Sequence, residues 1–268
     1  MFKLASLVLT PNQVDSDKIV DKLSNEISSG MEIHEIGQLA SEIAAALALH
    51  HPDYSMLAGR IALSHLYKFA ELKFSTLISR LYHQYDPISK DHAPIIHEEK
   101  YNLVMKYADV LDGALQHCND ELFDYFAIKT LKKTFLKKID GVVIERPQHM
   151  LMRVALEING GDIDSVLRTY ELLSKHYYTH ATPTIVNACT TYNQLSSCFL
   201  APVRSDSSIS GVYDTLKDCA VIGEHGGGVG LSISGICSSK GSLGGGIVPL
   251  LRLFNNSIRY TSEVSVVI

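Results

Sequence analysis

The sequence predicts a mainly α N-terminal region followed by the incomplete start of an α/β domain. Apolar residues recur three and four positions apart through much of the first part of the chain, which is the period of an amphipathic helix. Beyond residue 180, short apolar runs typical of strands alternate with helical patterns. Only about 85 residues follow this change, fewer than an α/β barrel or a doubly wound sheet needs.

Three helices are predicted within the first hundred residues. The first carries Ile19, Leu23 and Ile27 on one face and ends at the helix stop formed by residues 28–30. The second covers the run IHEIGQLASEIAAALAL, and the third covers HPDYSMLAGRIALSHLYK, with Pro52 near its start. The apolar stripe of the third helix comprises Met56, Gly59, Leu63, Leu66 and Ala70.

A connector and a further helix come next. Two prolines and the lack of a clean period mark residues 84–98 as a connector. The run GDIDSVLRTYELLSKH then predicts a helix, because one face of it gathers Ile163, Leu167, Tyr170 and Leu173.

The last third of the chain predicts strands alternating with helices. The runs TPTIVNA and SSCFLAP are interpreted as short buried strands, and VGLSISG alternates as a strand does. Between them, SISGVYDTLKDCAVIGEH predicts a helix, and VPLLRLFNNSIRY predicts another near the end. The buried face of the former is expected to hold Ile209, Val212, Leu216 and Ala220.

Composition and charge exclude several classes of function. The 268 residues are 46% hydrophobic with a mean hydropathy of +0.08, which indicates a globular protein with a real core. A net charge of -5 gives no electrostatic basis for binding nucleic acid, and the lysines of LKKTFLKK are expected on a solvated helix face. Neither a signal peptide nor a membrane span is recognisable, so a cytoplasmic protein without membrane contact is expected.

Cysteines and histidines form no metal-binding pattern in the sequence. Five cysteines, at positions 118, 189, 198, 219 and 237, include no CxxC pair and no His/Cys pairing at zinc spacing. Most of these thiols are expected to be small buried hydrophobes. The histidines at 50, 51 and 149 are expected to be structural, with their hydrogen bonds satisfied, or to lie on the surface.

The sequence has two glycine-rich stretches, of which the first is a candidate anion site. The stretch HGGGVG, residues 225–230, could bring backbone N–H groups against a phosphate, but a tight helix-to-strand turn is the favoured interpretation. It lacks the Lys-Ser/Thr pair of a P-loop and the order of a dinucleotide fingerprint. No G-x-S-x-G elbow accompanies it, which argues against a hydrolase. The second stretch, KGSLGGGIVP, predicts a loop before the last helix.

Several stretches together resemble the N-terminal portion of the large (alpha) subunit of eukaryotic-type class I ribonucleoside-diphosphate reductase. The most specific are ERPQHMLMR and QLSSCFL, and the likeness extends over about residues 15 to 260. It implies a degenerate ATP-cone-like helical domain at 1–72, the N-terminal helical domain at 73–178, and the first strands and helices of a ten-stranded α/β barrel at 179–268.

The resemblance implies a redox role for one cysteine. Cys198 matches the family's redox-active thiol at the start of a barrel strand, whereas Cys189 stands where the family usually has Gly and is interpreted as a filler thiol. Thr182 and Ser197 match positions that contact the bound nucleotide. The family's radical-forming cysteine and the partner thiol of Cys198 correspond to sequence beyond residue 268, so a truncated chain that is inactive alone is expected.

The regulatory positions depart from the family. Ile33 and Gly37 occupy places where polar ATP ligands are usual, while Lys68 persists. At the specificity site, the effector would meet Asp206, Ser207 and Ser208, but Glu224 replaces a Lys and Cys237 replaces an Arg. A carboxylate near a triphosphate costs on the order of 1 to 4 kcal/mol in partly screened surroundings. Weak effector binding is therefore expected.

Cofactors and partners follow from the resemblance alone. The family uses ATP and dNTP effectors, a radical from the small subunit, and thioredoxin or glutaredoxin; no cofactor is assigned to this chain itself. The partners implied are the small subunit, ribonucleoside diphosphates, and another large subunit that packs on the helices at 208–224 and 248–260. The alternative hypothesis is a non-catalytic relative that binds a full-length large subunit as a regulatory or assembly partner.

Overall fold

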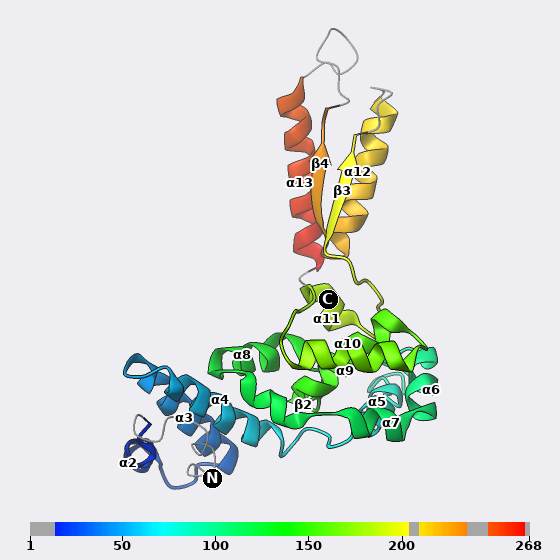
Figure 1. The fold of residues 1–268 in the computed structure, drawn as a ribbon. Helices are drawn as coiled ribbons and strands as arrows, with labels where there is room; N and C mark the ends of the chain where they lie inside the picture. The colour runs from blue at the N-terminus through cyan, green and yellow to red at the C-terminus, as the bar shows by residue number, and fades with distance from the viewer. Residues whose placement is uncertain (1–13, 204–208, 235–245, 266–268) are drawn as a thin grey trace. The chain divides into compact units, whose positions relative to one another are not determined.

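The computed structural model describes residues 14–203, 209–234 and 246–265, which are mainly helical (Figure 1). These residues form two compact units. Unit 1 comprises residues up to 180 together with 185–193, and unit 2 comprises 181–184 with the residues from 194 onward. Within the described ranges, no helix combines the length and apolar character that crossing a membrane requires.

Unit 1 is built almost entirely from helices. Its elements are, in chain order, α2 (Ser16–Glu26), α3 (Ile33–Ala46), η1 (Leu47–Leu49), α4 (Asp53–Leu66), α5 (Phe74–Tyr82), α6 (Glu98–Lys106), α7 (Ala108–Ala114), η2 (His117–Leu122), α8 (Tyr125–Thr130), the π-helical turn η3 (Leu131–Phe135), β1 (Lys138–Ile139), β2 (Val142–Val143), α9 (Pro147–Asn159) and α10 (Ile163–Ser174). The predicted helices are confirmed, as is the connector at 84–98, but Ile27 is not on the buried face of the first helix, because α2 ends at Glu26 and Ile27 is exposed in an extended conformation.

The first core of unit 1 lies between α2, α3 and α4. Ile19 and Leu57 are fully buried there, and the Asp15 side chain caps α2 by accepting from the Asp17 N–H. The stripe predicted on α4 is partly wrong, because Met56 is only half-buried. Leu57 and Ile61 supply that contact instead, since α4 packs against α3 on one side and α8 on another.

The second core surrounds α9. This helix begins with Pro147, whose missing N–H costs nothing at a first helical turn, and every residue from Pro147 to Leu156 is buried. A helix that is buried all round must satisfy its polar side chains internally. The motif ERPQHMLMR therefore forms the polar centre of a helical body.

Unit 2 is a single parallel βαβ unit followed by a helix (Figure 1). Strand β3 (Cys198–Pro202) pairs in parallel with β4 (Gly228–Ser232), and α12 (Ile209–Glu224) connects them. The last helix, α13 (Ile247–Ser265), packs on α12. The predicted strand and helix alternation is confirmed here, but the described residues show only two-stranded sheets and no closed barrel.

Three predictions of local structure are wrong. SSCFLAP forms a strand but not a buried one, because Cys198 and Leu200 are exposed. TPTIVNA is not a strand but the short helix α11 (Thr182–Asn187), with Pro183 in its first turn and with side chains from elsewhere in the chain bonding the carbonyls at its end. On α12, Ile209 is exposed. The buried face of that helix turns toward Val212, Thr215 and Cys219 instead, because these side chains meet α13 and the sheet.

Candidate functional site

Cys198 is the first residue of β3 and is exposed. Side chains alternate across a strand, so Phe199 and Ala201 turn toward α12 and α13, whereas Cys198 and Leu200 face away from them. The neighbouring strand β4 shows the same alternation of exposed and half-buried residues. Leu200 is 91% exposed, which marks this surface as the helix-free face of the sheet.

A glycine turn sets the register beside Cys198. Helix α12 ends at Glu224, Gly226 follows with φ +73°, and the Gly227 N–H donates to the Ile222 carbonyl at 2.9 Å. A Cβ on Gly227 would lie 2.6 Å from a methyl carbon of Ile222, so only glycine fits there. The favoured interpretation of HGGGVG as a helix-to-strand turn is confirmed. It places Gly228 directly opposite Cys198.

The hydroxyls predicted to contact a nucleotide lie in the same unit as Cys198. The Ser197 hydroxyl donates to the Cys198 sulfur at 3.5 Å, and the Ser197 carbonyl accepts from the Gly228 N–H at 2.8 Å. Thr182 is exposed at the first position of α11. The Thr184 hydroxyl, which was not predicted, donates to the Leu195 carbonyl at 2.9 Å and so ties the start of α11 to the segment before β3.

A buried charge cluster, which sequence reasoning missed, anchors the end of α11 within unit 1. Arg153 and Glu145 are both fully buried, with the Arg153 Nε 2.9 Å from a Glu145 oxygen. Arg153 also donates to the Ala188 carbonyl at 2.7 Å, and the Lys137 ammonium donates to the Val186 carbonyl at 2.8 Å. Burial lowers the pKa of Lys137 to about 8, so its expected place on a solvated face is wrong.

Cys189 is packed in the core of unit 1. Its side chain is 1% exposed, and its thiol donates to the Arg153 carbonyl at 3.1 Å. Burial raises the pKa of this thiol to about 12, which keeps it protonated and unreactive. The interpretation of Cys189 as a filler thiol agrees with this environment.

A hydrogen-bonded network runs through the middle of ERPQHMLMR. Gln148 donates to Asp120 at 2.8 Å and accepts from the hydroxyls of Tyr170 and Ser174, while Tyr67 donates to the other Asp120 oxygen. Burial raises the pKa of Asp120 to about 6, and the bonds from Tyr67 and Gln148 oppose that rise.

His149 differs from its predicted state. The ring is fully buried beside Phe74 and His117, and neither of its nitrogens has a hydrogen-bond partner among the described residues. It is a structural histidine, as predicted, but its hydrogen bonds are not satisfied, and a Leu72 backbone group only partly opposes the fall in its pKa. Burial, and next the charges of His117 and Arg146, lower the pKa of His149 to about 3, so the imidazole is neutral.

The regulatory positions are only partly described. Asp206, Ser207, Ser208 and Cys237 lie outside the described residues, as does most of the predicted loop KGSLGGGIVP. Glu224 is exposed at the end of α12, and Lys68 is exposed just after α4. Ile33 is 74% exposed, and a Cβ on Gly37 would lie 3.0 Å from the His65 ring.

Comparison with known proteins gives the class to which this fold and site belong. A family model described as "Ribonucleotide reductase, all-alpha domain" matches residues 121–193, and one described as "Ribonucleotide reductase, barrel domain" matches residues 196–266. Together they cover more than half of the chain. The first match falls on the helical body and the second on the βαβ unit that carries Cys198.

The chain belongs to the ribonucleotide reductase large-subunit family. It is 44% identical over 261 residues to "Ribonucleoside-diphosphate reductase large chain 2" of Saccharomyces cerevisiae, covering 95% of this chain and 30% of that protein. The large subunit of Vaccinia virus is likewise 44% identical over 95% of this chain and 34% of its own length. The large subunit of Arabidopsis thaliana is 41% identical over 267 residues, which are 97% of this chain and 33% of that protein. The chain thus spans about a third of the length of these relatives.

Proposed function

We propose that this chain acts as part of a ribonucleoside-diphosphate reductase large subunit, which reduces ribonucleoside diphosphates to deoxyribonucleoside diphosphates for DNA synthesis. The single observation that carries this proposal is the exposed thiol of Cys198 at the start of β3, on the helix-free face of a parallel sheet, in a chain of this family.

Cys198 supplies one of two reducing thiols. The overall reaction breaks the ribose C2′–O bond, releases the hydroxyl as water and forms a C2′–H bond. Two thiols give two electrons and two protons and become a disulfide, which a thioredoxin-type or glutaredoxin-type dithiol reduces again. Their Cα atoms must approach within about 5 to 6 Å for this bond. The second thiol and the radical belong to other parts of the complete enzyme.

Thr182 and Ser197 hold the nucleotide beside this thiol in the proposal. Both are hydroxyl side chains of unit 2, as Cys198 is, and a hydroxyl can donate to phosphate or sugar oxygens. Ser197 is adjacent in sequence to Cys198 and already contacts its sulfur.

Regulation is proposed to be weak in this chain. Residues 1–72 are assigned as an ATP-cone-like domain in which Gly37 and Ile33 supply no polar ligand, leaving Lys68 as the cation. The crowding of Gly37 against His65 supports this, because a longer side chain at that position has no room without movement of the ring. At the specificity site, the exposed carboxylate of Glu224 repels a triphosphate near Asp206, Ser207 and Ser208.

The proposed partners are the small subunit and a second large subunit. Exposed apolar side chains on α12 and α13 support the second of these, among them Tyr213, Val248 and Tyr260. A cytoplasmic location belongs to the same proposal, because the redox thiol must be kept reduced. A non-catalytic relative that caps a large subunit would use the same two helices, so binding alone does not distinguish the two functions.

An experiment with a chimeric large subunit distinguishes the reductase function from the non-catalytic one. The matched region of the yeast large chain 2 is replaced by this chain, and dCDP formation from CDP is measured with the yeast small subunit and thioredoxin. We expect turnover, its loss in Cys198→Ser, and its retention in the matched control Cys189→Ser. A chimera that folds and binds the small subunit but forms no dCDP would favour the non-catalytic relative.

A further inference from the structure

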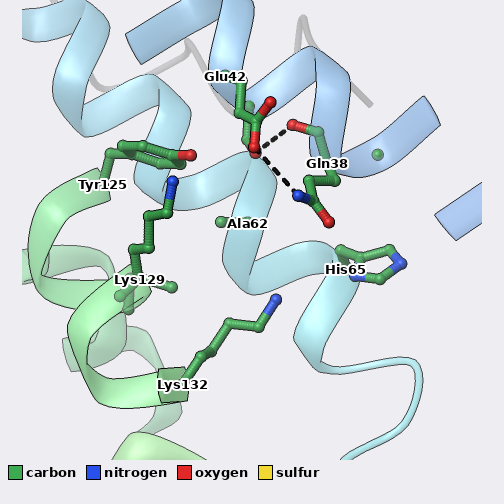
Figure 2. Close-up of a pocket in the computed structure, with 10 residues that line it drawn as sticks. Gln38, Glu42, Ala62, His65, Tyr125, Lys129 and Lys132 are labelled. Carbon is green, nitrogen blue, oxygen red and sulfur yellow. Dashed lines mark hydrogen bonds between the residues drawn. The ribbon is translucent and has the colours of Figure 1, made fainter. Parts of the chain in front are cut away.

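A pocket that the reductase chemistry does not use lies in unit 1, between α3, α4 and the segment formed by α8 and η3 (Figure 2). Its volume is about 130 Å³. Buried side chains form its inner wall, namely Ser41, Ala62 and Ile128. Of the positions implied for the ATP cone, only Gly37 reaches it; Ile33 and Lys68 do not line it.

Two lysines give the pocket its positive charge. Lys129 and Lys132 are three residues apart, so they lie on one face of the α8–η3 segment, and Figure 2 shows both side chains extending toward the pocket. The Lys129 ammonium lies 5.5 Å from the centre of the Tyr125 ring, a cation–π contact that favours this orientation.

The two lysines have no neutralising partner in the part of the chain that the structure describes. Among the residues that the structure describes, no carboxylate forms an ion pair with Lys129 or Lys132. Lys132 is half-buried, and burial lowers its pKa because the charged ammonium is poorly solvated there. Binding of an anion beside it is therefore favourable, because the anion compensates the buried positive charge.

The opposite wall carries an acceptor. Gln38 donates through its side-chain nitrogen to a Glu42 oxygen at 3.1 Å, which fixes the carboxylate on the α3 side of the pocket (Figure 2). The site thus combines two cations with one carboxylate. A fitting ligand carries anionic oxygens for the lysines and one O–H group for Glu42.

We propose that this pocket binds inorganic phosphate as the hydrogen phosphate ion. Lysine binds phosphate as a point charge, and hydrogen phosphate offers both negative charge and a P–OH group that Glu42 accepts. Sulfate carries similar charge but no proton at neutral pH, so its oxygen would face the Glu42 carboxylate and be repelled. The site therefore discriminates phosphate from sulfate.

The test is isothermal titration calorimetry on the 268-residue chain at neutral pH, with inorganic phosphate as the probe and chloride used to keep ionic strength constant. We expect saturable binding at one site and at least about tenfold weaker binding in Lys132→Gln, since one ionic contact of about 1.4 kcal/mol corresponds to that factor. Lys133→Gln, which alters the exposed neighbour, should bind as the wild type does, and Lys132→Arg should retain most of the affinity.

Three further arms complete the experiment. Sulfate should bind more weakly than phosphate, and Glu42→Gln should reduce that preference. Ribose 5-phosphate tests the need for a P–OH group, because a phosphomonoester with a second pKa of about 6 is largely unprotonated at neutral pH and should bind more weakly than phosphate. Tighter binding of ribose 5-phosphate than of phosphate would contradict the role of Glu42. Wild type without saturable binding, equal affinity in Lys132→Gln with native circular dichroism, or sulfate bound as tightly as phosphate would each overturn the proposal.

Discussion

The two cysteines of the stretch THATPTIVNACTTYNQLSSCFL show how environment divides one side chain into two roles. Cys189 is enclosed by unit 1 and its thiol is held protonated, whereas Cys198 opens a strand and is exposed. Thiolate chemistry requires solvent or reactant access as well as an accessible charged state. Cys198 alone of this pair meets the first requirement.

Alkylation of the native chain tests this difference. With iodoacetamide at pH 8 and mass spectrometry of the peptides, we expect the exposed Cys198 and Cys118 to be modified at least about tenfold faster than the buried Cys189 and Cys219. Unfolding in urea should equalise the rates. Rapid native modification of Cys189 would contradict its placement in the core.

The buried His149 makes stability depend on pH. Its pKa is about 3 in the folded chain and 6.5 when exposed, so below pH 6.5 the unfolded state binds the extra proton. The stabilisation present above pH 6.5 is therefore lost as the pH falls toward 3. Between pH 7 and pH 4, the loss from this group is about 3 kcal/mol in the free energy of unfolding.

Urea unfolding of His149→Leu at several pH values measures this effect. The variant should lose less stability than the wild type on acidification, so the difference between the two shrinks or reverses by pH 4. His50→Leu, at an exposed position, serves as the control and should follow the wild type. Parallel pH curves for His149→Leu and wild type would show that the imidazole is not desolvated.

At the scale of elements, Gly59 sets the approach of α4 to the start of α8. A Cβ at this position would lie 2.7 Å from the Phe123 carbonyl oxygen and 2.8 Å from the Asp124 carbonyl carbon. Both are backbone atoms, which cannot rotate away. We expect Gly59→Ala to lower the free energy of unfolding by about 1 to 3 kcal/mol despite the better helix propensity of alanine.

Gly113→Ala is the matched control for that substitution. Gly113 also lies in a helix, α7, but a Cβ there meets nothing within 4 Å. The alanine should be neutral or stabilise the chain by up to about 1 kcal/mol. Equal effects of the two substitutions, measured by urea unfolding, would mean that the α4 contact is looser than the structure gives.

The buried pair of Arg153 and Glu145 holds the end of α11. Removing one partner leaves an unpaired buried charge, so Arg153→Met should cost about 3 to 5 kcal/mol. The double variant Arg153→Met/Glu145→Gln should recover part of that loss, because no buried carboxylate is then left without its guanidinium partner. Urea unfolding of the three proteins measures both effects, and a double variant less stable than Arg153→Met would contradict the mechanism.

Helices with a clear period could be predicted from the sequence, and so could the strand that begins at Cys198. The error at Thr182–Asn187 arose because β-branched residues favour strands, whereas this segment is held as a helix by Lys137 and Arg153 from distant positions. The burial of Lys137 could not be predicted either, because it depends on the distant Val186 carbonyl to which the ammonium donates. Lys129 and Lys132 form a pocket only once α3 and α4 pack beside them, which no local pattern reveals.

At the scale of the whole molecule, the proposal rests on unit 2. Its sheet is covered by α12 and α13 on one face, while the other face exposes Cys198 and Leu200. A large exposed apolar side chain beside a thiol fits the inside of a barrel that further strands of a complete subunit would close. The chain spans about a third of the length of its relatives, so the account is best tested in a complete subunit.

The most direct measurement is a single turnover of the pre-reduced chimera with CDP and the small subunit, without added thioredoxin, followed by alkylation and peptide mapping. The account predicts that Cys198 becomes disulfide-bonded to a cysteine of the yeast-derived barrel in proportion to the dCDP formed, while Cys189 stays reduced. Formation of dCDP with Cys198 still fully alkylated would contradict it.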